Sequence, residues 1–246
     1  MSRLDQELVE RGLALSRSKA QRLIRQGAVT VDGATVTKPA ATVDATSAIT
    51  VTADDDYVSR GAYKLVGAFD AFGPQGLPAP EGFDCLDIGA STGGFTDVLL
   101  RNGAARVVAL DVGHGQLDPR IAGNPRVIEM SGVNIRDVHA EDLPFVPRMI
   151  VSDVSFISLT YVIPVIARIV GPVVDIVLLV KPQFEVGRGN LGKNGIVESE
   201  ELRRGALDKV IACAREHGLS VKATADSPIE GTHGNHEYLL WLQGRQ

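Results

Sequence analysis

The chain has 246 residues, 44% of them hydrophobic and 22% charged, a balance that excludes a disordered protein and allows one large domain and a small one. Its formal net charge of −5 gives no general sign of nucleic-acid binding, yet residues 1–52 carry seven Lys and Arg against five Asp and Glu. Two cysteines without metal-ligand spacing favour a reducing compartment, and no basic-then-apolar leader is present, so we expect a cytoplasmic protein.

The first 52 residues predict a small α+β domain. Five basic residues and no acidic residue lie between Arg11 and Arg25, so one helix carries a local excess of positive charge. The expected elements are a helix over 3–11 ended by Gly12, a helix capped by Ser16 and ended by Gly27, a hairpin over 28–37 around Asp32-Gly33, and a strand at 49–51. Residues 53–59, with the acidic run Asp54-Asp55-Asp56, predict a linker.

Residues 60–246 alternate between helical patterns and short apolar strands. Helices are expected over 64–72 and 199–217. The most apolar window runs from Tyr161 to Val180, and prolines and charges interrupt it, so it predicts a helix, a turn and a strand rather than a membrane span. The predicted strands are 84–88, 106–111, 126–129, 148–153, 175–181, 219–225 and 237–242. This alternation predicts an α/β fold, a Rossmann-like seven-stranded, mostly parallel sheet with helices on both faces.

A glycine-rich turn follows the first of these strands, at Gly89-Ala90-Ser91-Thr92-Gly93-Gly94. It lacks the G-x-G-x-x-G spacing of a dinucleotide site and the lysine of a triphosphate loop. The turn allows close backbone approach without phosphate machinery, which favours an amino-acid-bearing nucleoside such as S-adenosylmethionine. Asp111 ends the second strand, where a carboxylate can accept hydrogen bonds from ribose hydroxyls; alternatively, it caps the next helix.

Two charged residues close predicted strands at the edge where this fold places its ligands. Asp153 and Lys181 end the fourth and fifth strands, so both are expected to face the crevice of the glycine turn. Lys64, in the first helix of the sheet domain, and Glu237, at the last strand, join them as candidates, although each alone is more often a solvated charge. His233 and His236 lack the spacing of a metal site, and we expect no metal.

Together these residues resemble a known family. Lys64, Asp153, Lys181 and Glu237 match the K-D-K-E set of FtsJ-type ribose 2′-O-methyltransferases. The resemblance extends to the TlyA branch, rRNA cytidine 2′-O-methyltransferases that are also described as haemolysins, through VSRGAYKL, DIGASTGGFTDVLL, ALDVGHGQLD, SDVSFISL and LVKPQFEVG. Residues 1–52, with RLDQELVERGLALSRSKAQRLI and GAVTVDG, resemble the S-four RNA-binding fold.

The resemblance implies an S-adenosyl-L-methionine-dependent enzyme acting on ribosomal RNA or a ribosomal subunit. It implies that Lys181 is the base and that Lys64, Asp153 and Glu237 position the ribose and the other side chains. The implied cofactor residues are Asp87, Gly89, Ser91, Thr92, Gly94, Phe95, Asp111, Asn134 and Asp153. The expected RNA contacts are Arg3, Arg17, Lys19, Arg22 and Arg25.

Three other functions compete with this interpretation. A membrane-active haemolysin would need a spanning or strongly amphipathic segment, and the sequence suggests none. A nicotinamide-dependent dehydrogenase is disfavoured by the loop spacing. A catalytically idle RNA-binding or assembly protein is disfavoured by the complete K-D-K-E set. The target nucleotide, the ribosomal subunit and the oligomeric state stay open.

Overall fold

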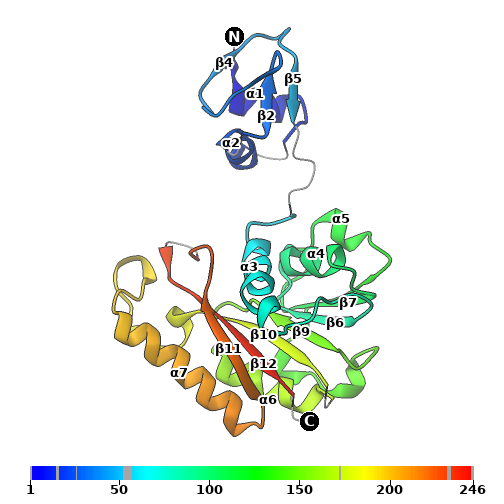
Figure 1. The fold of residues 1–246 in the computed structure, drawn as a ribbon, viewed down its shortest axis with the longest axis vertical. Helices are drawn as coiled ribbons and strands as arrows, with labels where there is room; N and C mark the ends of the chain where they lie inside the picture. Colours follow the sequence, from blue (N-terminus) through cyan, green and yellow to red (C-terminus); the bar gives the residue numbers. More distant parts are fainter. Residues whose placement is uncertain are drawn as a thin grey trace. The chain divides into compact units, whose positions relative to one another are not determined.

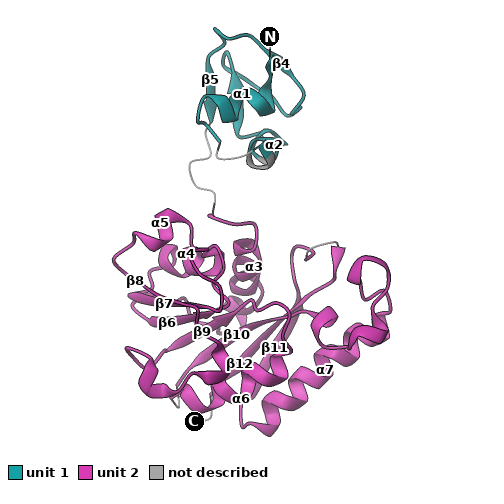
Figure 2. Ribbon diagram, turned by 180° about the vertical axis from the view of Figure 1, so that it is seen from behind, with its two compact units in different colours: residues 1–56 teal, residues 57–246 magenta. Residues whose placement is uncertain are grey.

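The computed structural model describes residues 2–14, 17–25, 27–51, 57–171, 173–231 and 234–244, without the side chains of residues 18, 19 and 22. The chain divides into two compact units, Met1–Asp56 and Tyr57–Gln246, coloured separately in Figure 2. Each unit is described by itself below.

The first unit is a small α+β domain around one apolar cluster. Its elements are β1 (Ser2–Arg3), α1 (Leu4–Glu10), α2 (Arg17–Arg25), β2 (Val29–Val31), β3 (Ala34–Thr35), β4 (Thr42–Val43) and β5 (Ile49–Val51). β1 pairs with β4, and β3, β2 and β5 form an antiparallel sheet. Asp32 and Gly33 have φ of 50° and 83°, as a tight hairpin turn requires, so the predicted hairpin is confirmed. The expected cap Ser16 lies outside the described residues, and β1 and β4 were not predicted.

The second unit contains a seven-stranded sheet flanked by helices (Figure 1). Its strands are β6 (Asp84–Ile88), β7 (Arg106–Asp111), β8 (Val127–Ser131), β9 (Met149–Ser152), β10 (Asp175–Val180), β11 (Ser220–Asp226) and β12 (Tyr238–Gln243). Its α-helices are α3 (Ala62–Phe72), α4 (Gly94–Arg101), α5 (Pro119–Ala122), α6 (Leu159–Ile169) and α7 (Glu200–Glu216). All seven predicted strands are confirmed, with bounds that differ by at most two residues.

The sheet has the order β11-β12-β10-β9-β6-β7-β8, and β12 runs antiparallel to both of its neighbours. The pairs β10–β9, β9–β6, β6–β7 and β7–β8 are parallel, so the predicted Rossmann-like fold is confirmed. Within the described part of the chain, no helix is both long enough and apolar enough to span a bilayer.

Strand side chains alternate between two buried layers, because successive residues of a strand point to opposite faces. Leu86 and Ile150 belong to the layer covered by α6 and α7. Cys85 and Met149, their chain neighbours, belong to the layer under α3 and α4. The central strands of the sheet are therefore buried on both faces, which explains why they are continuous apolar runs, whereas the edge strand β11 alternates between exposed and half-buried residues.

The topology fixes where a ligand can bind. β6 lies between β7 and β9, so the chain leaves its carboxyl end in one direction for β7 and reaches β9 on the other side. Such a switch point opens a crevice outside the carboxyl ends of parallel strands. The glycine turn, Asp153 and Lys181 follow strands at this edge, and Asp111 is the last residue of β7.

Candidate active site

The glycine turn is held in a conformation that its sequence permits. The N–H groups of Gly89 and Ala90 both donate to the carbonyl of Leu110, at 2.8 and 3.1 Å. Gly89 has φ of +83°, and a Cβ there would lie 3.1 Å from Val154 Cγ1 and 3.2 Å from the backbone of Asp153. A side chain at residue 89 would therefore be strained and crowded, which explains the glycine.

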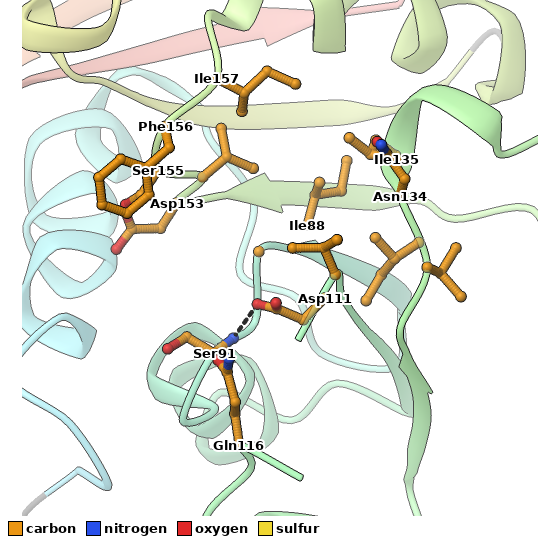
Figure 3. Close-up of a pocket in the computed structure, with 15 residues that line it drawn as sticks. Ile88, Ser91, Asp111, Gln116, Asn134, Ile135, Asp153, Ser155, Phe156 and Ile157 are labelled. Carbon is orange, nitrogen blue, oxygen red and sulfur yellow. Dashed lines mark hydrogen bonds between the residues drawn. The ribbon is translucent and has the colours of Figure 1, made fainter. Parts of the chain in front are cut away.

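A cavity of about 540 Å³ opens beside this turn, a size that suits a small ligand. Figure 3 shows Asp153, Ser155 and Phe156 at one end and Asn134 and Ile135 at the other. The lining residues are Ile88, Gly89, Ser91, Leu110, Asp111, Val112, Gln116, Val133, Asn134, Ile135, Asp153, Val154, Ser155, Phe156 and Ile157.

A second cavity of about 210 Å³ shares part of this wall. Its lining residues are Ser59, Gly61, Gly89, Ala90, Ser91, Thr92, Gly94, Phe95, Asp153, Ser155 and Lys181. Gly94 is required here because a Cβ would collide with Ser59 Oγ. Of the predicted cofactor residues, every one except Asp87 lines at least one of the two cavities.

Asp111 ties the glycine turn to the end of β7. Its Oδ2 accepts a hydrogen bond from the N–H of Ser91 at 2.8 Å, drawn in Figure 3, and its Oδ1 accepts one from the N–H of Gly113 at 2.8 Å. Each carboxylate oxygen has a second lone pair, so Asp111 can still accept hydrogen bonds from a ligand. The alternative that Asp111 caps the next helix is wrong, because Asp118 caps α5 through the N–H of Arg120.

Asn134 is held at the far end of the larger cavity. Its Oδ1 accepts a hydrogen bond from the N–H of Arg136 at 3.1 Å, which caps a short 3-10 helix at Ile135–Asp137. The amide is therefore fixed in orientation at the cavity wall.

The four predicted K-D-K-E residues form two buried or half-buried ion pairs. Lys181 Nζ lies 2.6 Å from Asp153 Oδ1, and Lys64 Nζ lies 2.6 Å from Glu237 Oε2. Gln183 links the two ion pairs. It lies two residues after Lys181 in the chain, and its Nε2 donates a hydrogen bond to Glu237 Oε1 at 3.4 Å. Buried charges are costly unless they are paired, so the fold holds these four residues together.

Asp87 occupies a different place from the other predicted cofactor residues. It is fully buried at the end of β6 and lines neither cavity, and its Oδ2 accepts a hydrogen bond from Thr96 Oγ1 at 2.7 Å. Burial raises the pKa of this carboxyl to about 7, opposed by the Thr96 hydrogen bond and assisted by the charge of Asp153. Asp87 therefore bonds to α4, the helix that follows the glycine turn, and faces neither cavity.

The expected RNA contacts of the first unit fall into two groups. Arg3 and Arg17 are half-exposed and pair with the fully buried Asp5, at 3.0 Å each. Hydrogen bonds from Arg3, and also from Gln21 and Arg17, hold the pKa of Asp5 well below its usual range. Arg25 is exposed, whereas the side chains of Lys19 and Arg22 lie outside the described part of the chain.

Sequence reasoning missed several residues of the site. Ser155 accepts a hydrogen bond from Lys181 Nζ at 2.8 Å, and Phe156 is 92% exposed at the cavity mouth with φ of +64°. Gln183 and Ser59 were also missed. The sequence offered only their positions as a signal: Ser155 and Phe156 follow Asp153, Gln183 follows Lys181, and Ser59 comes shortly before α3.

Among the described residues, no group of three His, Cys, Asp or Glu side chains could hold a metal ion. His233 lies outside the described residues, and the His236 ring lies against the Tyr238 ring, with centroids 6.4 Å apart.

The sheet order, the glycine turn at its switch point and the cavity beside it define a Rossmann-like methyltransferase fold. The sequence model for the FtsJ-like methyltransferases matches residues 57–244, and that for the S4 domain matches residues 2–49. The chain belongs to the FtsJ-like methyltransferase family, in its TlyA branch. The resemblance inferred from the motifs is confirmed.

Named relatives cover nearly the whole chain. The 16S/23S rRNA (cytidine-2′-O)-methyltransferase TlyA of Mycobacterium tuberculosis is 47% identical over 98% of this chain and 90% of its own length. Hemolysin A of Brachyspira hyodysenteriae is 43% identical over 96% of this chain and 98% of its own. A solved structure of a candidate hemolysin from Streptococcus thermophilus is 38% identical and superposes with a TM-score of 0.74, covering 100% of this chain and 89% of that one.

Proposed function

We propose that this protein transfers a methyl group from S-adenosyl-L-methionine to the ribose 2′-hydroxyl of a cytidine in ribosomal RNA. The observation that carries the proposal is the Lys181–Asp153 pair, which lines the smaller cavity beside the glycine turn, since a lysine held by a carboxylate supplies a base for a hydroxyl bound there. The name of the M. tuberculosis relative supports the choice of acceptor.

The residues of the two cavities suit S-adenosyl-L-methionine. Gly89 and Gly94 let the turn pack closely against Asp153, Val154 and Ser59, and both glycines line the smaller cavity, so their backbone faces a ligand there. We assign the methionine end to the smaller cavity, the ribose to the carboxylate of Asp111 and the adenine to the apolar end near Asn134. The residues that would hold the methionine end are Gly89, Ser91, Thr92, Gly94 and Phe95.

The chemistry asks little of the protein beyond alignment and removal of a proton. When bound, S-adenosyl-L-methionine supplies a methyl group already activated on a sulfonium. Lys181 Nζ accepts the hydroxyl proton as the ribose oxygen takes the methyl group, so Lys181 must be neutral when transfer begins. Asp153 fixes the direction of the Lys181 amine, and the Lys64–Glu237 pair positions the ribose.

The test separates binding from transfer. Lys181→Ala should bind S-adenosyl-L-methionine within about twofold of wild type by calorimetry, yet transfer methyl groups to rRNA at least about 100-fold more slowly. Lys222→Ala, which removes an exposed lysine of β11, is the matched control and should keep full activity. Full turnover by Lys181→Ala would contradict the assignment, and binding of NAD in place of S-adenosyl-L-methionine would favour the dehydrogenase.

Mapping of ribose methylation identifies the acceptor. Ribosomal RNA from cells that lack this protein should lose a 2′-O-methylcytidine that reappears when the wild-type gene, but not the Lys181→Ala gene, is restored. An unchanged methylation map, together with leakage of liposomes by the purified protein, would favour a membrane-active haemolysin instead.

We further assign the first unit to RNA binding and the second unit, from Tyr57, to catalysis; the linker predicted over 53–59 overlaps the start of the second unit, where Ser59 lines the smaller cavity. Replacing Lys19, Arg22 and Arg25 with Gln should weaken RNA binding and flatten its salt dependence by about 0.7–0.9 in the log–log slope for each phosphate that is no longer neutralised. Lys38→Gln, an exposed lysine of the same unit, is the matched control. An unchanged slope in the triple variant would place the RNA elsewhere.

A further inference from the structure

Lys181 has two polar partners on one turn of the chain, an ion-pair partner and a hydrogen-bond acceptor. Its Nζ lies 2.6 Å from Asp153 Oδ1 and donates to Ser155 Oγ at 2.8 Å. Both partners, Asp153 and Ser155, follow β9 and are separated by a single residue. Ser155 also lines both cavities, so its hydroxyl lies at the wall that they share.

The turn that carries Ser155 adopts an uncommon backbone conformation. Phe156, the next residue, has φ of +64°, which is rare for an aromatic side chain, and it is 92% exposed. Such conformations cost about 1–3 kcal/mol and persist only where the surroundings impose them. Here the N–H of Asp153 donates to the carbonyl of Ile88 at 3.1 Å, which anchors the beginning of the turn.

The other end of the turn is anchored by a buried carboxylate. Glu185 Oε2 accepts a hydrogen bond from Ser158 Oγ at 2.5 Å, and Oε1 accepts one from the N–H of Leu159 at 2.7 Å. Ser158 in turn caps α6. Residues 153–158 are thus fixed at both ends, which explains how Ser155 keeps its place beside Lys181 without being buried itself.

We infer that Ser155 is a positioning residue that aims the lone pair of Lys181 at the acceptor hydroxyl. This inference rests on the proposed function, in which Lys181 is the base. A neutral amine has two N–H bonds and one lone pair in a tetrahedral arrangement. Ser155 accepts one of these N–H bonds and the carboxylate of Asp153 attracts the other, so the lone pair takes the remaining direction. Lys181 lines the smaller cavity, where the acceptor hydroxyl would lie.

The single carboxylate of Asp153 could not achieve this alone. An ion pair has no strict direction, so the amine could rotate about its Cε–Nζ bond and turn the lone pair away from the hydroxyl. The hydrogen bond to Ser155 opposes this rotation. Loss of alignment in a reacting group costs about 10- to 100-fold in rate, so Ser155 is expected to act on the transfer step and not on binding.

The experiment compares Ser155→Ala with Ser155→Thr, which keeps a hydroxyl. Ser155→Ala should lower kcat for rRNA methylation about 10- to 100-fold, with KM for RNA and Kd for S-adenosyl-L-methionine within about twofold of wild type. Ser155→Thr should recover most of kcat. Ser220→Ala, at the exposed start of β11, is the control for loss of a serine hydroxyl and should match wild type.

A second measurement needs no turnover. With ¹⁵N-labelled lysine, the Nζ protons of Lys181 should exchange with water faster in Ser155→Ala than in wild type, because one acceptor has been removed. Unchanged kcat in Ser155→Ala, or equal loss in the Ala and Thr variants, would overturn the inference.

Loss of S-adenosyl-L-methionine binding in Ser155→Ala would also overturn it, since Ser155 would then be a cofactor contact. Failure of the proposed function is distinguishable, because the wild-type protein itself would then transfer no methyl group to rRNA.

Discussion

Asp87→Asn removes a charge that the folded methyltransferase unit holds unfavourably. The carboxyl is fully buried, one oxygen accepts from Thr96, and no group among the described residues bonds the other oxygen, Oδ1. Burial raises the pKa of Asp87 from 3.8 to about 7, so between these values the folded protein binds a proton that the unfolded chain has released.

The sign and the size of the effect follow from this difference. A raised carboxyl pKa contributes stability that is present below about pH 4 and is lost as the pH rises to about 7. Each pH unit in that window is worth about 1.4 kcal/mol, so the free energy of unfolding should fall by about 4 kcal/mol across it from this group alone. An amide does not titrate, so Asp87→Asn escapes the loss.

The assay uses urea unfolding from pH 5 to pH 8, followed by fluorescence of Trp241. This is the only tryptophan of the chain and it is buried in the second unit, so the signal reports that unit. The free energy of unfolding of Asp87→Asn minus that of wild type should rise by about 1.4 kcal/mol per pH unit up to pH 7 and then level off. Any fixed cost of the amide shifts the whole curve without changing its slope.

Asp70→Asn provides the matched control, because Asp70 is an exposed carboxylate on α3. Its difference from wild type should stay flat over the same range. A flat difference for Asp87→Asn as well would refute the reasoning, since it would mean that Asp87 is ionised at no cost throughout.

Three further changes test other parts of the molecule. Asp5→Ala removes the buried carboxylate that two arginines share and should destabilise the first unit by about 2–3 kcal/mol, measured by hydrogen exchange; unchanged protection of α1 would contradict this. Gly89→Ala places a Cβ 3.1 Å from Val154 Cγ1 at a φ of +83°, so it should weaken S-adenosyl-L-methionine binding at least about tenfold by calorimetry. Gly73→Ala, which has open space around it, is the control and should leave binding unchanged. Phe156→Ala removes an exposed aromatic ring at the cavity mouth. Because stacking on a base contributes about 1–3 kcal/mol, KM for RNA should rise about tenfold while cofactor binding stays unchanged. An unchanged KM would mean that the base binds elsewhere.

Local patterns determined most of the strands of the second unit because its central strands are buried on both faces. Such strands are uninterrupted apolar runs bounded by turn residues, as at 84–88 and 175–180, and these are visible without any partner. The two-residue strands β1 and β4 carry no such pattern, and they form only because Ser2 meets Val43 across the unit.

The sequence by itself indicated the family and the residues that carry its chemistry, because a charged residue directly after an apolar strand, such as Asp153 or Lys181, is recognisable from the sequence alone. Only the tertiary structure decided which charges pair: Lys181 with Asp153 and Lys64 with Glu237, 173 residues apart along the chain. It also showed that Asp87 is buried and lines neither cavity. Ion pairs, burial and cavities depend on distances between distant segments, and the order of strands in the sheet sets those distances.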